Sequence, residues 1–141
     1  MATLLSLRHT VEMRYLSLEW IEQMQKEVAA SESLTALAHS HSIGVTQVIT
    51  DGPEGTVMYH LQVGDGTASF GPGAAPQEHV RIEQSWDTAV SVATEQAPAQ
   101  EFFIKGLIRV SGDAQLLIES APIFGALDSV FSTVRNVTEY V

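Results

Sequence analysis

Residues 43–86 form a run of short alternating segments separated by glycine-rich turns, and this run limits the folds that the chain can adopt. The segment "TVMYHLQV" has the period-two pattern of a strand with one buried face. It lies between "DGPEG" and "GDG", which predict hairpin connections on both sides. Strands joined by consecutive hairpins run antiparallel, so a doubly wound parallel sheet is excluded. The inward side chains of this segment are Val57, Tyr59, Leu61 and Val63.

Further strands are predicted on either side of this segment. Residues 43–50 are rich in β-branched side chains, and "TASF" follows the "GDG" turn. The segments "HVRIEQSW" and "LIRVS" alternate again, and this alternation turns Gln84 inward. A buried amide needs partners, so we expect Gln84 to bond neighbouring backbone or to meet a ligand head group. The inward apolar side chains of these two segments are Val80, Ile82, Trp86, Ile108 and Val110.

Helices are predicted before the strand run. Residues 17–31 have a capping serine, an acidic first turn and apolar side chains at helical spacing. Residues 34–38 predict a second, short helix, and residues 1–14 fit either a flexible arm or an extra strand. The apolar positions of the first helix are Leu18, Ile21, Met24 and Val28.

Two helices are predicted between the strands "HVRIEQSW" and "LIRVS". We expect Asp87 to cap a helix over residues 88–96. Pro98 suits the first turn of a short helix, because its missing N–H is not needed there. This short helix carries Phe102 and Phe103.

The segment "IKGLIRVSGDAQLL" places a strand between two glycines and then an aspartate before another apolar run. We expect Gly106 to let the chain leave the preceding helix closely packed, and Asp113 to cap the next helix. Pro122 then opens a longer helix, which we expect to act as a lid on the apolar interior or to complete an ordinary core. The apolar stripe of this helix consists of Ile123, Phe124, Leu127, Val130, Phe131 and Val134.

These elements predict an α+β fold with about five mostly antiparallel strands and helices packed on one face of the sheet. A chain of 141 residues can bury one sizeable core. We therefore expect a single domain over residues 1–141.

The charge balance excludes several classes of partner. The formal net charge of -10 argues against a grip on nucleic acid or on anionic lipid head groups. Only 17% of the residues are charged, which leaves an unusually neutral surface. The chain has no cysteine, and "MATLLSLRHT" has neither a basic leader region nor the length of a membrane span. We expect a cytoplasmic protein without integral membrane association.

No residue pattern predicts a catalytic or metal centre. His39 and His41 could bind a metal together only on an extended segment, and we expect a surface loop there. The segment "GDGTASFG" lacks the Gly-Lys-Ser/Thr of a phosphate-binding loop, and no serine has a plausible histidine and acid as partners. We therefore expect no catalytic residue, no metal and no cofactor.

Aromatic side chains from several predicted elements converge with few polar groups among them. Such a set forms either a plain core or an apolar pocket. The low surface charge and the separate apolar helix near the C-terminal end favour the pocket. The aromatic members are Tyr59, Phe70, Trp86, Phe103, Phe124 and Phe131.

The segment "WDTAVSVATEQAPAQEFFIKGLIRVSGDAQLL" resembles the sterol carrier protein 2 family, whose signature joins a helix, a proline-led turn, Phe-x-x-Gly, an alternating strand and Gly-Asp. Upstream, "YLSLEWIEQM" is similar to the opening helix of that family, and residues 43–86 are similar to its strand meander. Leu107 departs from the pattern, because a basic residue often follows the glycine, whereas here Lys105 precedes it. The signature positions are filled by Phe103, Gly106, Ile108, Val110, Gly112 and Asp113.

This resemblance implies an intracellular binder or carrier of lipids, such as sterols, fatty acids or fatty acyl-CoA, without a cofactor or catalytic residues of its own. We expect non-enzymatic binding or transfer of a hydrophobic ligand between sheet and helices, by a monomer or a homodimer. The expected ligand-binding residues are Tyr59, Phe70, Gln84, Trp86, Phe103, Ile108, Val110, Phe124, Leu127 and Phe131.

Two other functions are compatible with these residues. The first is an accessory subunit or a small enzyme acting on a hydrophobic substrate, such as a cone-shaped isomerase. Its minimum machinery would be Tyr59 with an inward acid, and the sequence supplies the tyrosine without a convincing acid. The second is an interaction module in which the apolar helix stripe forms a homodimer seam.

Overall fold

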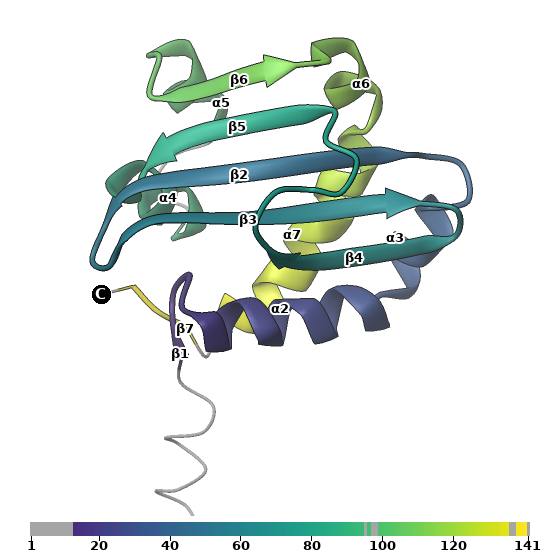
Figure 1. The fold of residues 1–141 in the computed structure, drawn as a ribbon, viewed down its shortest axis with the longest axis horizontal. Helices are drawn as coiled ribbons and strands as arrows, with labels where there is room; N and C mark the ends of the chain where they lie inside the picture. The colour runs from purple at the N-terminus through teal and green to yellow at the C-terminus, as the bar shows by residue number, and fades with distance from the viewer. Residues whose placement is uncertain (1–12, 95, 97–98, 136–137, 141) are drawn as a thin grey trace, which may run out of the picture.

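The computed structural model describes residues 13–94, 96, 99–135 and 138–140 of the chain. Its main sheet has five strands in the order β4-β3-β2-β5-β6, seen face-on in Figure 1. A separate parallel pair joins β1 (Met13–Arg14) to β7 (Thr138–Glu139). The strands of the main sheet are β2 (Ile43–Gly52), β3 (Gly55–Gly64), β4 (Thr67–Pro72), β5 (Val80–Ser85) and β6 (Ile108–Gly112).

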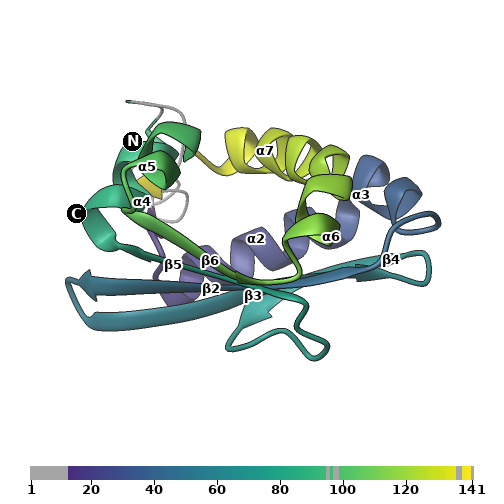
Figure 2. The same ribbon diagram turned by 90° about the horizontal axis from the view of Figure 1, so that it is seen from above.

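The helices lie on one face of the main sheet, as Figure 2 shows. Neighbouring strands of this sheet are antiparallel, apart from β2 and β5, which are parallel. The predicted α+β fold is therefore confirmed. The helices are α2 (Leu18–Ala30), α3 (Glu32–Leu37), α4 (Trp86–Ala93), α5 (Ala99–Ile104), α6 (Ala114–Glu119) and α7 (Ala121–Arg135).

Helix α2 confirms the predicted opening helix, but its buried face differs from the predicted one at the first turn. The Ser17 hydroxyl accepts a hydrogen bond from the Trp20 backbone N–H at 3.2 Å, which caps the first turn. Leu18 is 63% exposed, whereas Trp20 is fully buried. The buried residues of α2 are Trp20, Ile21, Met24 and Val28.

Helix α4 begins earlier than the sequence predicts. Ser85 has extended backbone angles, and its hydroxyl accepts a hydrogen bond from the Thr88 N–H at 3.3 Å. The prediction that Asp87 caps this helix is wrong, because Asp87 lies in the first turn. Helix α5 confirms the short helix of Phe102 and Phe103, while the predicted role of Pro98 lies outside the described residues.

The connection between β4 and β5 crosses the outer face of the sheet, opposite the helices (Figure 2). Its Ala75 N–H donates to the buried hydroxyl oxygen of Thr46 at 3.0 Å. Farther along, the Gly44 N–H donates to His79 Nδ1 at 2.9 Å, and the His79 N–H donates to the Gly44 carbonyl oxygen at 2.8 Å. These bonds attach the connection to β2 and bring β5 alongside that strand.

The two glycines around β6 serve different purposes. Both have positive φ, +78° at Gly106 and +101° at Gly112. A Cβ at Gly106 would have no neighbour within 4 Å, so the expected close packing there is wrong. A Cβ at Gly112 would instead clash with the backbone carbonyl oxygen of His79. Asp113 caps α6 as predicted, since its Oδ1 accepts from the Leu116 N–H at 3.0 Å.

We predict unequal costs for alanine at these two glycines. Gly106→Ala should lower the free energy of unfolding by about 1–2 kcal/mol, because only the left-handed backbone opposes a Cβ. Gly112→Ala should cost at least about 3 kcal/mol, because it adds a backbone clash to the same strain. Urea unfolding of both variants beside the unchanged protein measures this difference. Equal losses would contradict the assignment of the close approach to Gly112.

Candidate functional site

The inner face of the central strands forms the floor of the site. Gln47 of β2 lies opposite Tyr59 of β3 and opposite Ile82 of β5. Directly opposed residues on neighbouring strands project from the same face of a sheet. The adjacent row pairs Ile49 with Gln84. A mostly apolar floor therefore contains two amide side chains close to each other.

Helix α7 forms the roof, and its predicted apolar stripe divides into two groups. One group, Ile123, Val130 and Val134, is buried, and α7 contacts α2, α3 and α6. The other group is only partly buried and lines a cavity above the floor. This cavity-facing group consists of Phe124, Leu127 and Phe131.

The cavity has an enclosed part of about 40 Å³ and a more open part of about 190 Å³. The open part lies between α4 and α7. Residues that line both parts are Gln47, Tyr59, Phe124, Leu127 and Phe131. The enclosed part is also lined by Trp20, Met24, Val45, Leu61 and Phe70. The open part is also lined by Tyr15, Gln84, Ala89, Val92, Ala93 and Asp128.

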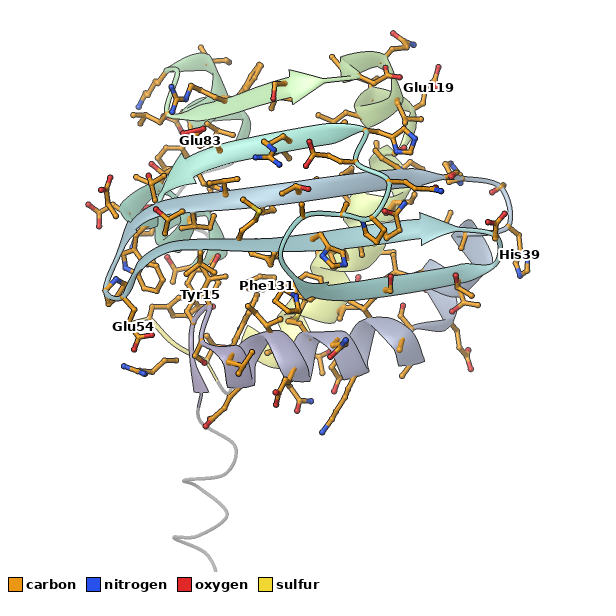
Figure 3. The ribbon with its side chains drawn as sticks, in the orientation of Figure 1. Tyr15, His39, Glu54, Glu83, Glu119 and Phe131 are labelled. Atoms are coloured by element: carbon orange, nitrogen blue, oxygen red, sulfur yellow. The ribbon has the colours of Figure 1, made fainter. Side chains whose placement is uncertain are left out.

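Aromatic rings hold the walls of the cavity in place. The ring centroid of Phe131 lies 5.4 Å from that of Trp20 and 6.2 Å from that of Tyr15. Figure 3 labels Tyr15 and Phe131. The Trp20 indole N–H donates to the Thr138 hydroxyl oxygen at 3.1 Å, which fixes the orientation of the indole. Edge-on and tilted rings at these separations attract one another. The wall therefore has a defined shape.

The two amides of the floor are joined to each other. Gln84 Nε2 donates a hydrogen bond to Gln47 Oε1 at 3.2 Å. Gln84 Oε1 is buried and accepts no hydrogen bond. The inward orientation predicted for Gln84 is therefore observed, while its amide bonds a side chain and not the backbone. A buried acceptor without a donor costs about 1–3 kcal/mol.

The phenols beside the cavity stay neutral well above neutral pH. Burial raises the pKa of Tyr59 above its ordinary value. Burial is also the largest cause that raises the pKa of Tyr15, and the neighbouring phenols of Tyr59 and Tyr140 raise it further. A neutral phenol can both donate and accept a hydrogen bond. The site thus offers hydroxyl and amide groups and no phenolate.

The predicted ligand-binding residues occupy different places. Trp86 lies with Tyr15 beside a small surface recess, their ring centroids 5.4 Å apart. Phe103, Ile108 and Val110 line an open recess at the edge strand β6, and Phe103 is 53% exposed. The other predicted residues surround the cavity: Tyr59, Phe70, Gln84, Phe124, Leu127 and Phe131.

Several cavity-lining residues that were not predicted have a recognisable signal in the sequence. Trp20 and Met24 are four residues apart, the spacing of one helix face. Gln47 stands between Val45 and Ile49 in the same alternation that turned Gln84 inward. Tyr15 carries no such signal, because it precedes the first regular element of the main fold.

Charged side chains lie outside the enclosed part of the cavity. Asp128 is exposed and lines only the open part. His39 and His41 line a surface recess with Asp65. Within the described residues, no group of three or more His, Asp or Glu side chains could hold a metal ion. None of the described helices is long and apolar enough to cross a membrane.

We predict that stability falls at alkaline pH because of the two buried phenols. An unfolded tyrosine ionises at a pH of about 10, whereas folded Tyr15 and Tyr59 have raised pKa values. Their contribution is therefore complete below about pH 10 and is lost as pH rises toward the folded values. Urea midpoints between about pH 8 and about pH 11.5 test this, with Tyr59→Phe expected to flatten the decline. A midpoint that stays constant over this range would refute the prediction.

No protein-family model matches the chain, and curated proteins give no match either. Solved structures do match. A Thermus thermophilus protein described as possibly a sterol carrier protein is 17% identical, with a TM-score of 0.62 over 90% of this chain and 92% of that one. A crystal structure of sterol carrier protein 2 is 18% identical, with a TM-score of 0.60 over 86% and 98%. The apo form of sterol carrier protein 2 from Yarrowia lipolytica is 14% identical, with a TM-score of 0.59 over 82% and 89%.

Two further matches are more distant. A palmitated sterol carrier protein 2-like protein of Aedes aegypti is 11% identical, with a TM-score of 0.51 over 78% of this chain and 93% of that one. The sec-alkylsulfatase Pisa1 from Pseudomonas sp. is 16% identical, with a TM-score of 0.50 over 77% of this chain and 16% of the enzyme. The chain thus has the fold of sterol carrier protein 2, as its sequence resemblance predicted.

Proposed function

We propose that this chain binds a hydrophobic small molecule between the inner face of its sheet and α7, and carries it without catalysing a reaction. The observation that carries this proposal is the cavity under α7, whose walls are mainly aromatic and aliphatic. Binding sites for small molecules are predominantly apolar, with a few placed polar groups. The palmitated Aedes aegypti protein of the same fold supports a ligand with a long apolar chain.

Burial of apolar surface supplies the affinity in this proposal. Each Å² of apolar surface removed from water contributes about 25 cal/mol before the costs of ordering. A long alkyl chain therefore binds more tightly as more of its length is buried, and it needs few polar contacts. The aromatic wall around Trp20 and Phe131 provides such cover at defined positions.

The cavity in this conformation is too small for such a ligand. Even its open part, about 190 Å³, is below the roughly 300–1,000 Å³ of typical small-molecule sites. A long-chain ligand therefore enters only when the roof moves away from the floor. We propose that α7 makes this movement and acts as a lid.

The packing of α7 favours such a movement. Its cavity-facing side chains are only partly buried, so a tilt of α7 that lifts them while Ile123, Val130 and Val134 stay packed exposes less new apolar surface than lifting the whole helix. Its sequence also includes Pro122 and Gly125 near the start, and a Cβ at Gly125 would have no neighbour within 4 Å. The sheet keeps its own strand pairing when α7 shifts, because α7 donates no strand to it.

A second candidate function follows from the alkylsulfatase match. In that enzyme the similar region is a small share of a longer chain. The same cavity would then present a hydrophobic substrate to a catalytic partner. This candidate differs from a free carrier because it needs a second protein for any turnover.

Native mass spectrometry of freshly purified protein tests the proposed function directly. We expect a monomer that carries a lipid-sized mass, and saturable binding of a dodecyl chain labelled with BODIPY after that mass is removed. A ligand-free dimer that fails to bind the labelled chain would overturn the proposal and favour a homodimeric interaction module.

We further predict that Phe131→Ala weakens ligand binding without the stability loss expected for a fully buried phenylalanine. This change removes a ring that lines both parts of the cavity, so it should weaken binding of the labelled chain several-fold. It should lower the free energy of unfolding by less than the about 3–5 kcal/mol of a fully buried phenylalanine. Phe103→Ala is the matched control, since Phe103 is 53% exposed and lies outside the cavity.

Hydrogen exchange of residues 121–135 completes the test of the lid. Bound ligand should slow exchange in this helix, because it fills the space below the roof. Full protection in the ligand-free protein, together with a large stability loss and unchanged binding in Phe131→Ala, would make α7 an ordinary core helix.

A further inference from the structure

The two edges of the main sheet have different surroundings. The edge strand β4 lies beside α2, which runs along it in Figure 1. The opposite edge strand, β6, has no further strand beside it within the described residues. Only the short helices α5 and α6 lie at its two ends (Figure 1). An unpaired edge presents backbone N–H and C=O groups with which another strand can pair.

The backbone groups of β6 alternate between β5 and the open edge. The Asp113 N–H donates to the His79 carbonyl oxygen at 2.9 Å, at the end of the antiparallel pair of β5 and β6. In an antiparallel ladder, every second residue bonds to the neighbouring strand. Counting back from Asp113, the odd-numbered residues of β6 bond to β5. The N–H and C=O groups of Ile108 and Val110 therefore point to the open edge.

Exposed apolar side chains gather near both ends of β6. The described residues include five large hydrophobic side chains that are exposed, and one of them, Leu18, belongs to α2. The other four lie just before or just after β6, on α5, on the turn that follows α5, and on α6. Exposed apolar residues that cluster mark an interaction site, whereas scattered ones do not. The four are Phe103, Ile104, Leu107 and Ile118.

The charges around β6 balance locally, unlike those of the whole chain. The formal net charge of -10 makes two copies of the chain repel each other. Three exposed ion pairs surround β6, and each cancels its own charge. A second copy therefore meets less repulsion at this edge than elsewhere. The pairs are Arg81 with Glu78, Lys105 with Glu101, and Arg109 with Glu83.

We propose that a second copy of this chain pairs its β6 antiparallel to β6 across a two-fold axis, so that two five-stranded sheets become one continuous sheet. In the register centred on Val110, this residue lies opposite its own counterpart, and Arg109 lies opposite Ser111 of the second copy. The same surface serves both partners, as in most homodimers. The inference goes beyond the proposed function and does not depend on it, because the cavity lies under α7 and opens between α4 and α7.

The two ends of the edge complement each other in this pair. Antiparallel pairing brings the α5 end of one copy to the α6 end of the other. Exposed Ile104 then comes to the end where Ile118 of the second copy is exposed. Lys105 comes to the same end, where α6 carries the exposed acid Glu119, labelled in Figure 3. Apolar groups thus meet apolar groups, and a cation meets an anion, which favours a second copy over an unrelated strand.

The pair is weak, because the strand has only five residues and the apolar groups beside it are few. Interfaces that bury less than about 1,200 Å² belong to transient complexes. We expect a Kd on the order of 100 µM. At the low micromolar concentrations of native mass spectrometry the protein is therefore mostly monomeric.

Sedimentation velocity of the full chain from about 10 µM to about 1 mM tests the pair, a range that brackets the expected Kd. We expect a reversible shift from monomer to dimer. Ile118→Lys should raise the Kd at least about tenfold, because it replaces an apolar contact by a cation close to Lys105 of the other copy. Leu18→Lys is the matched control, since Leu18 is exposed on α2 and makes the same change in net charge.

A disulfide test reports the register directly, since the chain has no cysteine of its own. Arg109 and Ser111 of the second copy form a non-hydrogen-bonded pair in this register, with Cα atoms about 4.5 Å apart, which a disulfide can span. Copies with Arg109→Cys mixed with copies with Ser111→Cys should therefore cross-link under mild oxidation. Either variant alone should cross-link much more slowly, because its two cysteines are diagonal neighbours about 7–8 Å apart.

Three outcomes decide the inference. A chain that stays monomeric at the highest concentration would overturn it, and would leave the edge to an extended segment of another protein. A dimer that Ile118→Lys does not weaken, without preference for the mixed disulfide, would place the seam elsewhere and overturn it too. The disulfide result decides alone if Ile118→Lys does not fold. Ile118 lines neither part of the cavity, so binding of dodecyl-BODIPY should be unchanged in this variant, and the dimer and the proposed function can fail separately.

Discussion

The connection between β4 and β5, which crosses the outer face of the sheet, determines how the other elements are arranged. It leaves the edge strand β4, passes over β3 and β2, and delivers β5 parallel to β2. Its backbone lies so close to β2 that a Cβ at Gly44 would clash with the Gln77 carbonyl oxygen. One face of the sheet is thus taken by this connection, and the helices gather on the other (Figure 2).

The same parallel pairing creates the cavity floor. Because β5 lies beside β2, Gln84 stands in the row next to Gln47, and the two amides meet although 37 residues separate them. A purely structural floor would hold apolar side chains at both positions, as it does at Ile49 and Ile82. Departures from local rules concentrate at functional sites, where another gain compensates for the stability lost.

Local patterns predicted the strands, the hairpins and two helix caps, because each depends on neighbouring residues. Their arrangement was harder to predict. Ser85 and Asp87 are both residue types that cap helices, and Ser85 is the cap because β5 ends there. The parallel partner of β2 depends on a connection whose bonds are long-range. Phe103 was assigned to the pocket by its residue type, whereas its short helix lies at the sheet edge.

Under the proposed function, stability and ligand affinity depend on the same contacts at α7. A cavity leaves the side chains around it without packing partners on one side, so Phe124, Leu127 and Phe131 gain less dispersion energy than a close-packed core would give them. A ligand that fills the space restores those contacts, and its stabilisation of the folded chain grows with its concentration. Tighter packing of α7 on the sheet would stabilise the fold and weaken binding, because the ligand would then have to break contacts between α7 and the sheet before it could enter. The partly buried half of α7 is therefore where a carrier of this fold can adjust affinity without disturbing the sheet.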